Sequence, residues 1–129
     1  MDQPAQFQFA APVFLVDDVV QTADWYRDFM GFRIRFASAD HGFGIVDRDN
    51  IEVHLMRAST PGARNSVTAI KENGGDLYVF VRDADELYEE YKAKGVEMLE
   101  DPADQFYGMR DFRVRDLNGY VIGFGHSVR

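Results

Sequence analysis

Hydrophobic and polar residues follow the same order twice along this chain. Residues 13–34 read VFLVDDVVQTADWYRDFMGFRI, and residues 77–98 read LYVFVRDADELYEEYKAKGVEM. Each stretch has an apolar run, an aspartate, apolar residues at helical spacing, a glycine and then a further hydrophobic residue. Laying the second stretch on the first places Asp83 on Asp18. This internal repeat predicts two similar structural modules.

The same residues mark the beginning and the end of a helix in each repeat. Asp18 and Asp83 each have a Gln or Glu three residues later, which is the spacing of a capping box. Gly31 and Gly95 follow the two helical stretches. Glycine enters the left-handed conformation that ends many helices at little cost, so both helices are expected to stop there.

Apolar and polar residues alternate after each helical stretch, and this alternation predicts strands. The expected strands are residues 31–37, 43–48 and 51–57 in the first repeat, and 96–100, 109–116 and 119–125 in the second. Each apolar run before a helix adds one more strand. The order in each repeat is therefore βαβββ.

The domain organisation follows from these elements. The first module covers about residues 11–57 and the second about 76–126, and the polar, glycine-bearing segment 58–75 is the linker. We predict one domain over residues 1–129, with an α+β fold. The two βαβββ modules should form a curved mixed sheet, a cup, with the helices on its outer face.

Two motifs resemble those of the vicinal oxygen chelate superfamily, which holds glyoxalase I, extradiol dioxygenases and the fosfomycin and bleomycin resistance proteins. The motifs are VDDVVQTADWYRDFMGF and GMRDFRVRDLNGYVI. The second is similar to a hairpin found among bleomycin-resistance-like members. The resemblance covers about residues 11–125. It implies that the protein is a homodimer, with modules paired within or across chains.

In enzymes of this superfamily, side chains from the first and last strands of the modules bind a divalent metal. Carried over by the resemblance, the four ligand positions are Ala11, Glu52, Asp76 and Gly123. Alanine and glycine have no donor atoms, whereas a catalytic metal needs about three protein ligands. We therefore expect no cofactor, and the sequence leans against an enzyme without deciding the question.

One alternative metal set stays open at this stage. His54 follows Glu52 by two residues, so the two side chains share a strand face. Together with Asp76 they would supply one imidazole and two carboxylates, a donor set that suits iron or zinc. The alternative function is thus a glyoxalase-like metal-dependent lyase, isomerase or dioxygenase.

Two glycines stand on one face of the last predicted strand, at positions 123 and 125. Glycine inside a strand often marks the close approach of another group. We interpret them as a cleared floor on the concave face, with Tyr78 and Phe80 beside it. The other reading is that these two aromatic residues simply fill the cup. The candidate ligand-binding residues are Glu52, His54, Asp76, Tyr78, Phe80, Phe106, Tyr107 and Gly123.

The amino-acid composition limits the kinds of partner expected for this protein. The chain has 22 acidic and 14 basic residues and a formal charge of −8, which argues against nucleic acid. No apolar run reaches the roughly 20 residues of a membrane span. The absence of cysteine excludes thiolate metal sites and fits a cytoplasmic protein.

The function that the sequence favours is bleomycin-resistance-like binding. Such a protein would sequester a cationic or aromatic small molecule in a concave, metal-free pocket. An interaction or regulatory module without a small ligand is a third reading that stays open.

Overall fold

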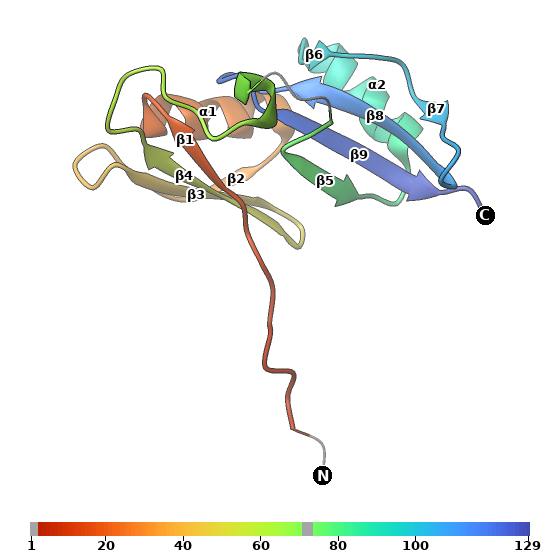
Figure 1. Ribbon diagram of the computed structural model, residues 1–129, viewed down its shortest axis with the longest axis horizontal. Coiled ribbons are helices and arrows are strands. Elements are labelled where there is room, and N and C mark those ends of the chain that lie inside the picture. The colour runs from red at the N-terminus through yellow and green to blue at the C-terminus, as the bar shows by residue number, and fades with distance from the viewer. Residues whose placement is uncertain (1–2, 71–73) are drawn as a thin grey trace.

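The computed structural model describes residues 3–70 and 74–129. Its elements follow the predicted order of two βαβββ modules (Figure 1), and the α+β fold is confirmed. The first module contains β1 (Val13–Val16), α1 (Val19–Met30), β2 (Arg33–Ser38), β3 (Phe43–Arg48) and β4 (Ile51–Arg57). The second contains β5 (Leu77–Phe80), α2 (Ala84–Lys94), β6 (Glu97–Met98), β7 (Ala103–Asp104), β8 (Met109–Arg115) and β9 (Val121–Ser127).

The strands form two separately hydrogen-bonded sheets. The first has the order β1-β4-β3-β2 and the second the order β5-β9-β8-β6, with β7 also paired to β8. In each sheet the first strand of the module runs parallel to the last one. The sequence predicted one curved sheet, whereas the structure has one sheet in each module.

Two details of the second module differ from the predicted strands. The segment expected at 96–100 is a strand only at Glu97–Met98, and the short β7 was not predicted. Two-residue strands are too short to produce an alternating pattern that can be recognised. The linker also contains a short 3₁₀ helix, Val67–Ile70, where only an irregular connection was expected.

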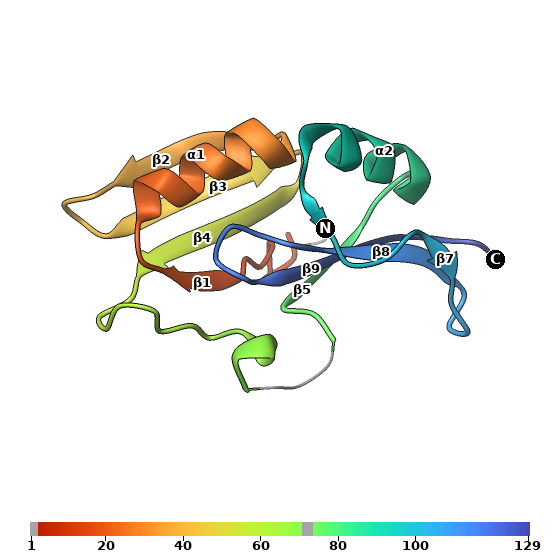
Figure 2. The same ribbon diagram turned by 90° about the horizontal axis from the view of Figure 1, so that it is seen from above.

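Both helices begin and end where the sequence indicated. The Asp18 side chain accepts a hydrogen bond from the backbone N–H of Gln21, and the Asp83 side chain accepts one from that of Glu86. Gly31 and Gly95 are left-handed, with φ of 74° and 86°. α1 packs on the first sheet and α2 on the second, and the two helices also touch. Figure 2 shows α1 over β2 and β3 of the first sheet and α2 beside β8 and β9 of the second.

One hydrophobic core includes residues of both modules. Phe14 of β1 stacks on Tyr120, which precedes β9, with ring centroids 4.2 Å apart. The hydroxyl of Tyr26 on α1 donates to Asp116 Oδ2 at 2.5 Å, in the turn between β8 and β9. Burial raises the pKa of the Asp116 carboxyl, although the hydrogen bonds that it accepts act against the shift. The modules are thus joined by buried contacts that are both apolar and polar.

The N-terminal segment leads away from this body (Figure 1). Phe7 and Phe9 lie on it with 93% and 71% of their surface exposed. Within the described residues, no helix is long and apolar enough to cross a membrane.

Candidate functional site

The two glycines of β9 lie beneath an aromatic ring. In the parallel pairing of β5 with β9, Tyr78 is opposite Gly123 and Phe80 is opposite Gly125. A Cβ atom added at Gly123 would lie 3.0 Å from Tyr78 Cδ2, and one added at Gly125 would overlap the Tyr78 hydroxyl. The cleared floor expected from the sequence is therefore wrong, because the ring of Tyr78 takes up that room.

The hydroxyl of Tyr78 donates a hydrogen bond to a buried carboxylate. Asp111 on β8 is only 5% exposed, and its Oδ2 accepts hydrogen bonds from Tyr78 at 2.8 Å and Tyr107 at 2.6 Å. The bond to Asp111 raises the pKa of Tyr107 to about 12. Burial and the same carboxylate raise the pKa of Tyr78 as well. Both phenols therefore stay protonated near neutral pH; Tyr78 links β5 to β8, and Tyr107 holds the loop before β8 against that strand.

A pocket of about 330 Å³ opens beside this group on the second sheet. Its lining combines aromatic rings, two carboxylates, one guanidinium and one amide. Arg113 of β8, the cross-strand partner of Gly123, also lines the pocket, and its Nε donates to Glu100 Oε1 at 2.9 Å. The lining residues are Gly74, Gly75, Leu77, Tyr78, Glu100, Gln105, Tyr107, Asp111, Arg113 and Gly123. We call this the module-two pocket.

The structure distributes the other predicted residues over several places. Phe80 and Phe106 are exposed by 74% and 94%, and each ring meets the edge or face of a neighbouring tyrosine. Of the eight predicted residues, the module-two pocket brings together Tyr78, Tyr107 and Gly123. Their contribution to binding stays a prediction.

Glu52 and His54 lie on β4, in the sheet of the other module. His54 Nε2 is 2.7 Å from Glu52 Oε1, and Arg35 donates to Glu52 Oε2 at 2.8 Å. Both oxygens of this carboxylate are therefore already bonded to neighbouring side chains.

The carboxylate of Asp76 has hydrogen-bond partners of a different kind. Its carboxylate accepts hydrogen bonds from the Ser66 hydroxyl at 2.8 Å and from the backbone N–H groups of Val67 and Val121 at 2.7 and 2.9 Å. Asp76 thus fastens the linker to β9. Its oxygens are occupied by these donors, which is a structural role that the sequence did not reveal.

The donor set Glu52, His54 and Asp76 consequently does not fit a metal. Among residues 3–70 and 74–129, no group of three or more His, Asp or Glu side chains is arranged to hold a metal ion. Ala11 and Gly123, at the two other positions implied by the resemblance, bring no donor atoms. The side chains at the four positions therefore do not make up a metal centre of the kind that the resemblance implies.

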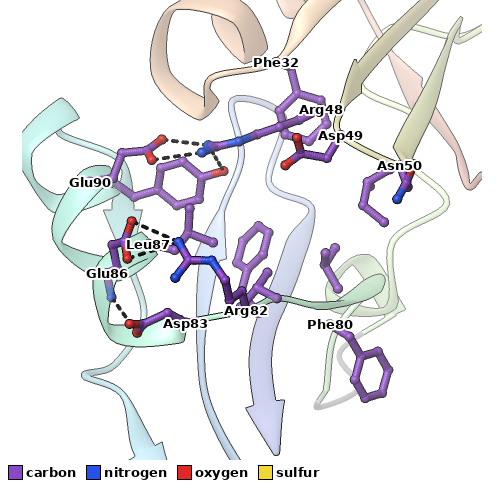
Figure 3. Close-up of a pocket in the computed structure, with 15 residues that line it drawn as sticks. Phe32, Arg48, Asp49, Asn50, Phe80, Arg82, Asp83, Glu86, Leu87 and Glu90 are labelled. Carbon is purple, nitrogen blue, oxygen red and sulfur yellow. Dashed lines mark hydrogen bonds and ion pairs between the residues drawn. The ribbon is translucent and has the colours of Figure 1, made fainter.

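A second cavity, of about 280 Å³, lies at the seam between the modules (Figure 3). The turn after β3 forms one wall, and α2 with the end of β5 forms the other. Arg48 makes two hydrogen bonds to Glu90, of 2.7 and 2.9 Å, and Arg82 pairs with Glu86 at 3.2 Å. Two of the four carboxylates that line the seam cavity, Glu86 and Glu90, therefore already have cationic partners.

The sequence reasoning missed the polar residues of the module-two pocket. Asp111 and Arg113 stand opposite Gly125 and Gly123 in the β8–β9 hairpin. The alternation of β8 and the turn between the two strands contain this register, so these residues could have been found. Glu100 and Gln105 lie in the irregular segment between β6 and β8. No periodic pattern marks them.

Two βαβββ modules with helices on the outer side, and a polar and aromatic pocket on a sheet face, define the class of two-module vicinal oxygen chelate folds. The chain belongs to the Glyoxalase/Bleomycin resistance protein/Dioxygenase superfamily, whose family model matches residues 8–124. A comparison with curated protein sequences finds no significant match.

Several solved structures are similar over nearly the whole chain. The bleomycin-binding protein from bleomycin-producing Streptomyces verticillus, complexed with copper(II)-bleomycin, is 25% identical, with a TM-score of 0.71 over 94% of this chain and 97% of that chain. The bleomycin resistance determinant of transposon Tn5 is 19% identical, with a TM-score of 0.69 over 95% and 100%. A glyoxalase-related enzyme from Clostridium phytofermentans is 17% identical, with a TM-score of 0.75 over 98% and 100%. The latter two likenesses show the shared fold.

Proposed function

We propose that this protein is a bleomycin-resistance-like binding protein that sequesters a cationic or aromatic small molecule without a metal. The module-two pocket carries the proposal, because it joins aromatic rings to two carboxylates in one cavity of about 330 Å³. Ligand pockets combine an apolar or aromatic lining with a few polar groups that fix orientation. A cation is attracted both by carboxylates and by the face of an aromatic ring.

The likeness to the protein from Streptomyces verticillus supports this proposal, because that protein, 25% identical to this chain, is a bleomycin-binding protein that holds copper(II)-bleomycin. The enzyme alternative would need a metal set that Glu52, His54 and Asp76 do not form. Binding without turnover needs only the pocket.

The proposal predicts a measurable affinity for bleomycin. In a calorimetric titration with metal-free and copper(II)-bleomycin, we expect a dissociation constant of about 1 μM or lower. Tyr107→Ala removes a ring that lines the pocket and should weaken binding about tenfold or more. Leu117→Ala is a matched control, because Leu117 is 43% exposed against 47% for Tyr107 and lies at the opposite end of β8. An absence of heat for bleomycin and for a panel of cationic aromatic drugs would contradict the proposal.

We further propose that two copies associate through the first module and the N-terminal segment. Phe7 and Phe9 are almost uncovered, and Val13, Phe36 and Met56 are each about two-fifths exposed. By the strand register Val13, Phe36 and Met56 share one face of the first sheet, and apolar residues exposed together on a face often mark an interface. Sedimentation analysis should show a species of twice the chain mass. The double substitution Phe7→Ser and Phe9→Ser should shift it toward the monomer, whereas a monomer at all concentrations would exclude this assembly.

The cytoplasmic location and the lack of nucleic-acid binding expected from the sequence stay predictions. Both are compatible with a protein that captures a small molecule.

A further inference from the structure

Two carboxylate oxygens in the module-two pocket lack partners among the described residues. Asp111 uses only Oδ2 for the two tyrosine hydroxyls, and no hydrogen bond reaches Oδ1 from the described part of the chain. Glu100 uses Oε1 for Arg113, and its Oε2 is buried without a hydrogen bond from any described residue. The cost of leaving a buried acceptor unsatisfied, which is larger for a charged group, therefore falls on Glu100 Oε2.

Among the described residues, no donor of the pocket lining reaches either of these two oxygens. Each phenol already donates its single proton to Asp111 Oδ2, and the raised pKa values of both tyrosines keep those protons in place. The guanidinium of Arg113 gives Nε to Glu100 and Nη1 to the carbonyl oxygen of Gly74, at 3.3 Å. Arg113 keeps further N–H groups and Gln105 has an amide, but within the described part of the chain neither side chain makes a hydrogen bond to Asp111 Oδ1 or Glu100 Oε2.

The net charge of the pocket lining also favours a positively charged ligand. Two carboxylates, Asp111 and Glu100, face a single guanidinium, Arg113, so the lining carries one negative charge in excess. Asp111 is nine-tenths or more buried, which strengthens its electrostatic interaction with a charge that enters. The rings of Tyr78 and Tyr107 also line the pocket, and aromatic rings attract a flat or cationic group.

We infer that the module-two pocket selects a protonated amine or amidine carried on an aromatic body, with Asp111 Oδ1 and Glu100 Oε2 accepting its N–H groups. The inference rests on the proposed binding function and names the ligand class and the two residues that recognise it. Asp111 fixes the cation between the aromatic rings, and Glu100 accepts a second N–H from the other side of Arg113. A neutral alcohol of the same shape has no positive charge and a single O–H donor, so at least one of the two oxygens stays unpaired, which is the physical basis of the discrimination.

Two probes that differ in one group test this inference: naphthylmethylamine, which is a cation at neutral pH, and the neutral naphthylmethanol. Calorimetry with the full chain should show at least tenfold tighter binding of the amine. Asp111→Asn and Glu100→Gln should each weaken the amine at least tenfold and leave the alcohol nearly unchanged. Glu97→Gln is the matched control, because Glu97 pairs with Arg115 on β6 and β8, outside the pocket lining.

Equal affinity for the two probes, or an equal loss for both in the variants, would overturn the cation inference while the binding function stands. If neither probe binds and bleomycin does not bind either, both the cation inference and the proposed binding function are overturned. Circular dichroism establishes that each variant is folded. If Asp111→Asn does not fold because its two tyrosine partners are lost, Glu100→Gln alone decides the question, since Glu100 is partly exposed.

Discussion

Replacing Tyr120 by alanine is expected to lower the free energy of unfolding by about 3–5 kcal/mol, the usual cost of truncating a buried aromatic side chain. Tyr120 is fully buried and stacks on Phe14 across the boundary between the modules, with an interplanar angle of 4°. Its hydroxyl lies 2.6 Å from the carbonyl oxygen of Leu15 and 2.7 Å from Asn65 Oδ1. The substitution thus leaves a cavity and also removes the hydrogen bonds that tie β1 and the linker to the second module.

Urea unfolding followed by circular dichroism measures this loss. Tyr120→Phe is the control, because it keeps the stacked ring and removes only the hydroxyl. It should cost about 1–3 kcal/mol, as expected for a buried acceptor that loses its donor. A loss below about 1 kcal/mol for Tyr120→Ala would show that the modules are not held together through this residue.

Alkaline pH is expected to destabilise the protein steeply, since buried tyrosines, Tyr26 and Tyr91 among them, resist ionisation in the folded state. Burial, followed by the charge of Asp116, raises the pKa of Tyr26 well above its ordinary value of 10.0. Burial also raises the pKa of Tyr91, whose hydroxyl donates to the Met30 carbonyl oxygen at 2.9 Å. Neither side chain has more than 1% of its surface exposed.

The difference in proton binding between the folded and unfolded states decides whether stability rises or falls with pH. Above pH ~10 the unfolded chain loses these phenolic protons and the folded protein keeps them, so unfolding releases protons. The stability is fully present below pH ~10 and is lost as the pH rises toward the raised folded values. Each of the two tyrosines should lower the free energy of unfolding by about 1.4 kcal/mol per pH unit in this range.

Two measurements examine the alkaline prediction. Near-ultraviolet absorbance should detect tyrosinate in the folded protein only well above the pH at which unfolded protein titrates. Urea unfolding at about pH 9, 10 and 11 should give the slope, and Tyr26→Phe should reduce it by one tyrosine's share. Titration of all tyrosines near pH 10 in the folded protein would contradict the buried positions of Tyr26 and Tyr91.

Much of the fold was predictable because the signals are local. Asp18 and Gly31 act within one helical turn of the residues they cap, and the same holds for Asp83 and Gly95. The strands from 43 to 57 alternate clearly, and they occur within the expected bounds. Local propensity and side-chain periodicity depend on neighbours in the sequence, so the sequence alone reveals them.

The candidate site was predictable only in part. Tyr78, Tyr107 and Gly123 share the pocket as expected. The counterparts expected from the first module, Glu52 and His54, lie on another sheet, where Arg35 binds the carboxylate. Asp76 is turned to the linker, whose backbone N–H groups compete for its oxygens. Which partner a carboxylate takes depends on long-range packing, and no sequence spacing encodes that choice.

By itself the sequence determined the two βαβββ modules, the helix limits and the apolar faces of the strands, because each depends on residues close together in the chain. Only the tertiary structure decided that the Tyr78 ring covers Gly123 and Gly125 and that Asp111 receives two tyrosine hydroxyls. It also decided that Asp111 and Glu100 face one pocket. These contacts join β5, β8, β9 and the segment before β8, so they exist only once the sheet has brought those strands together.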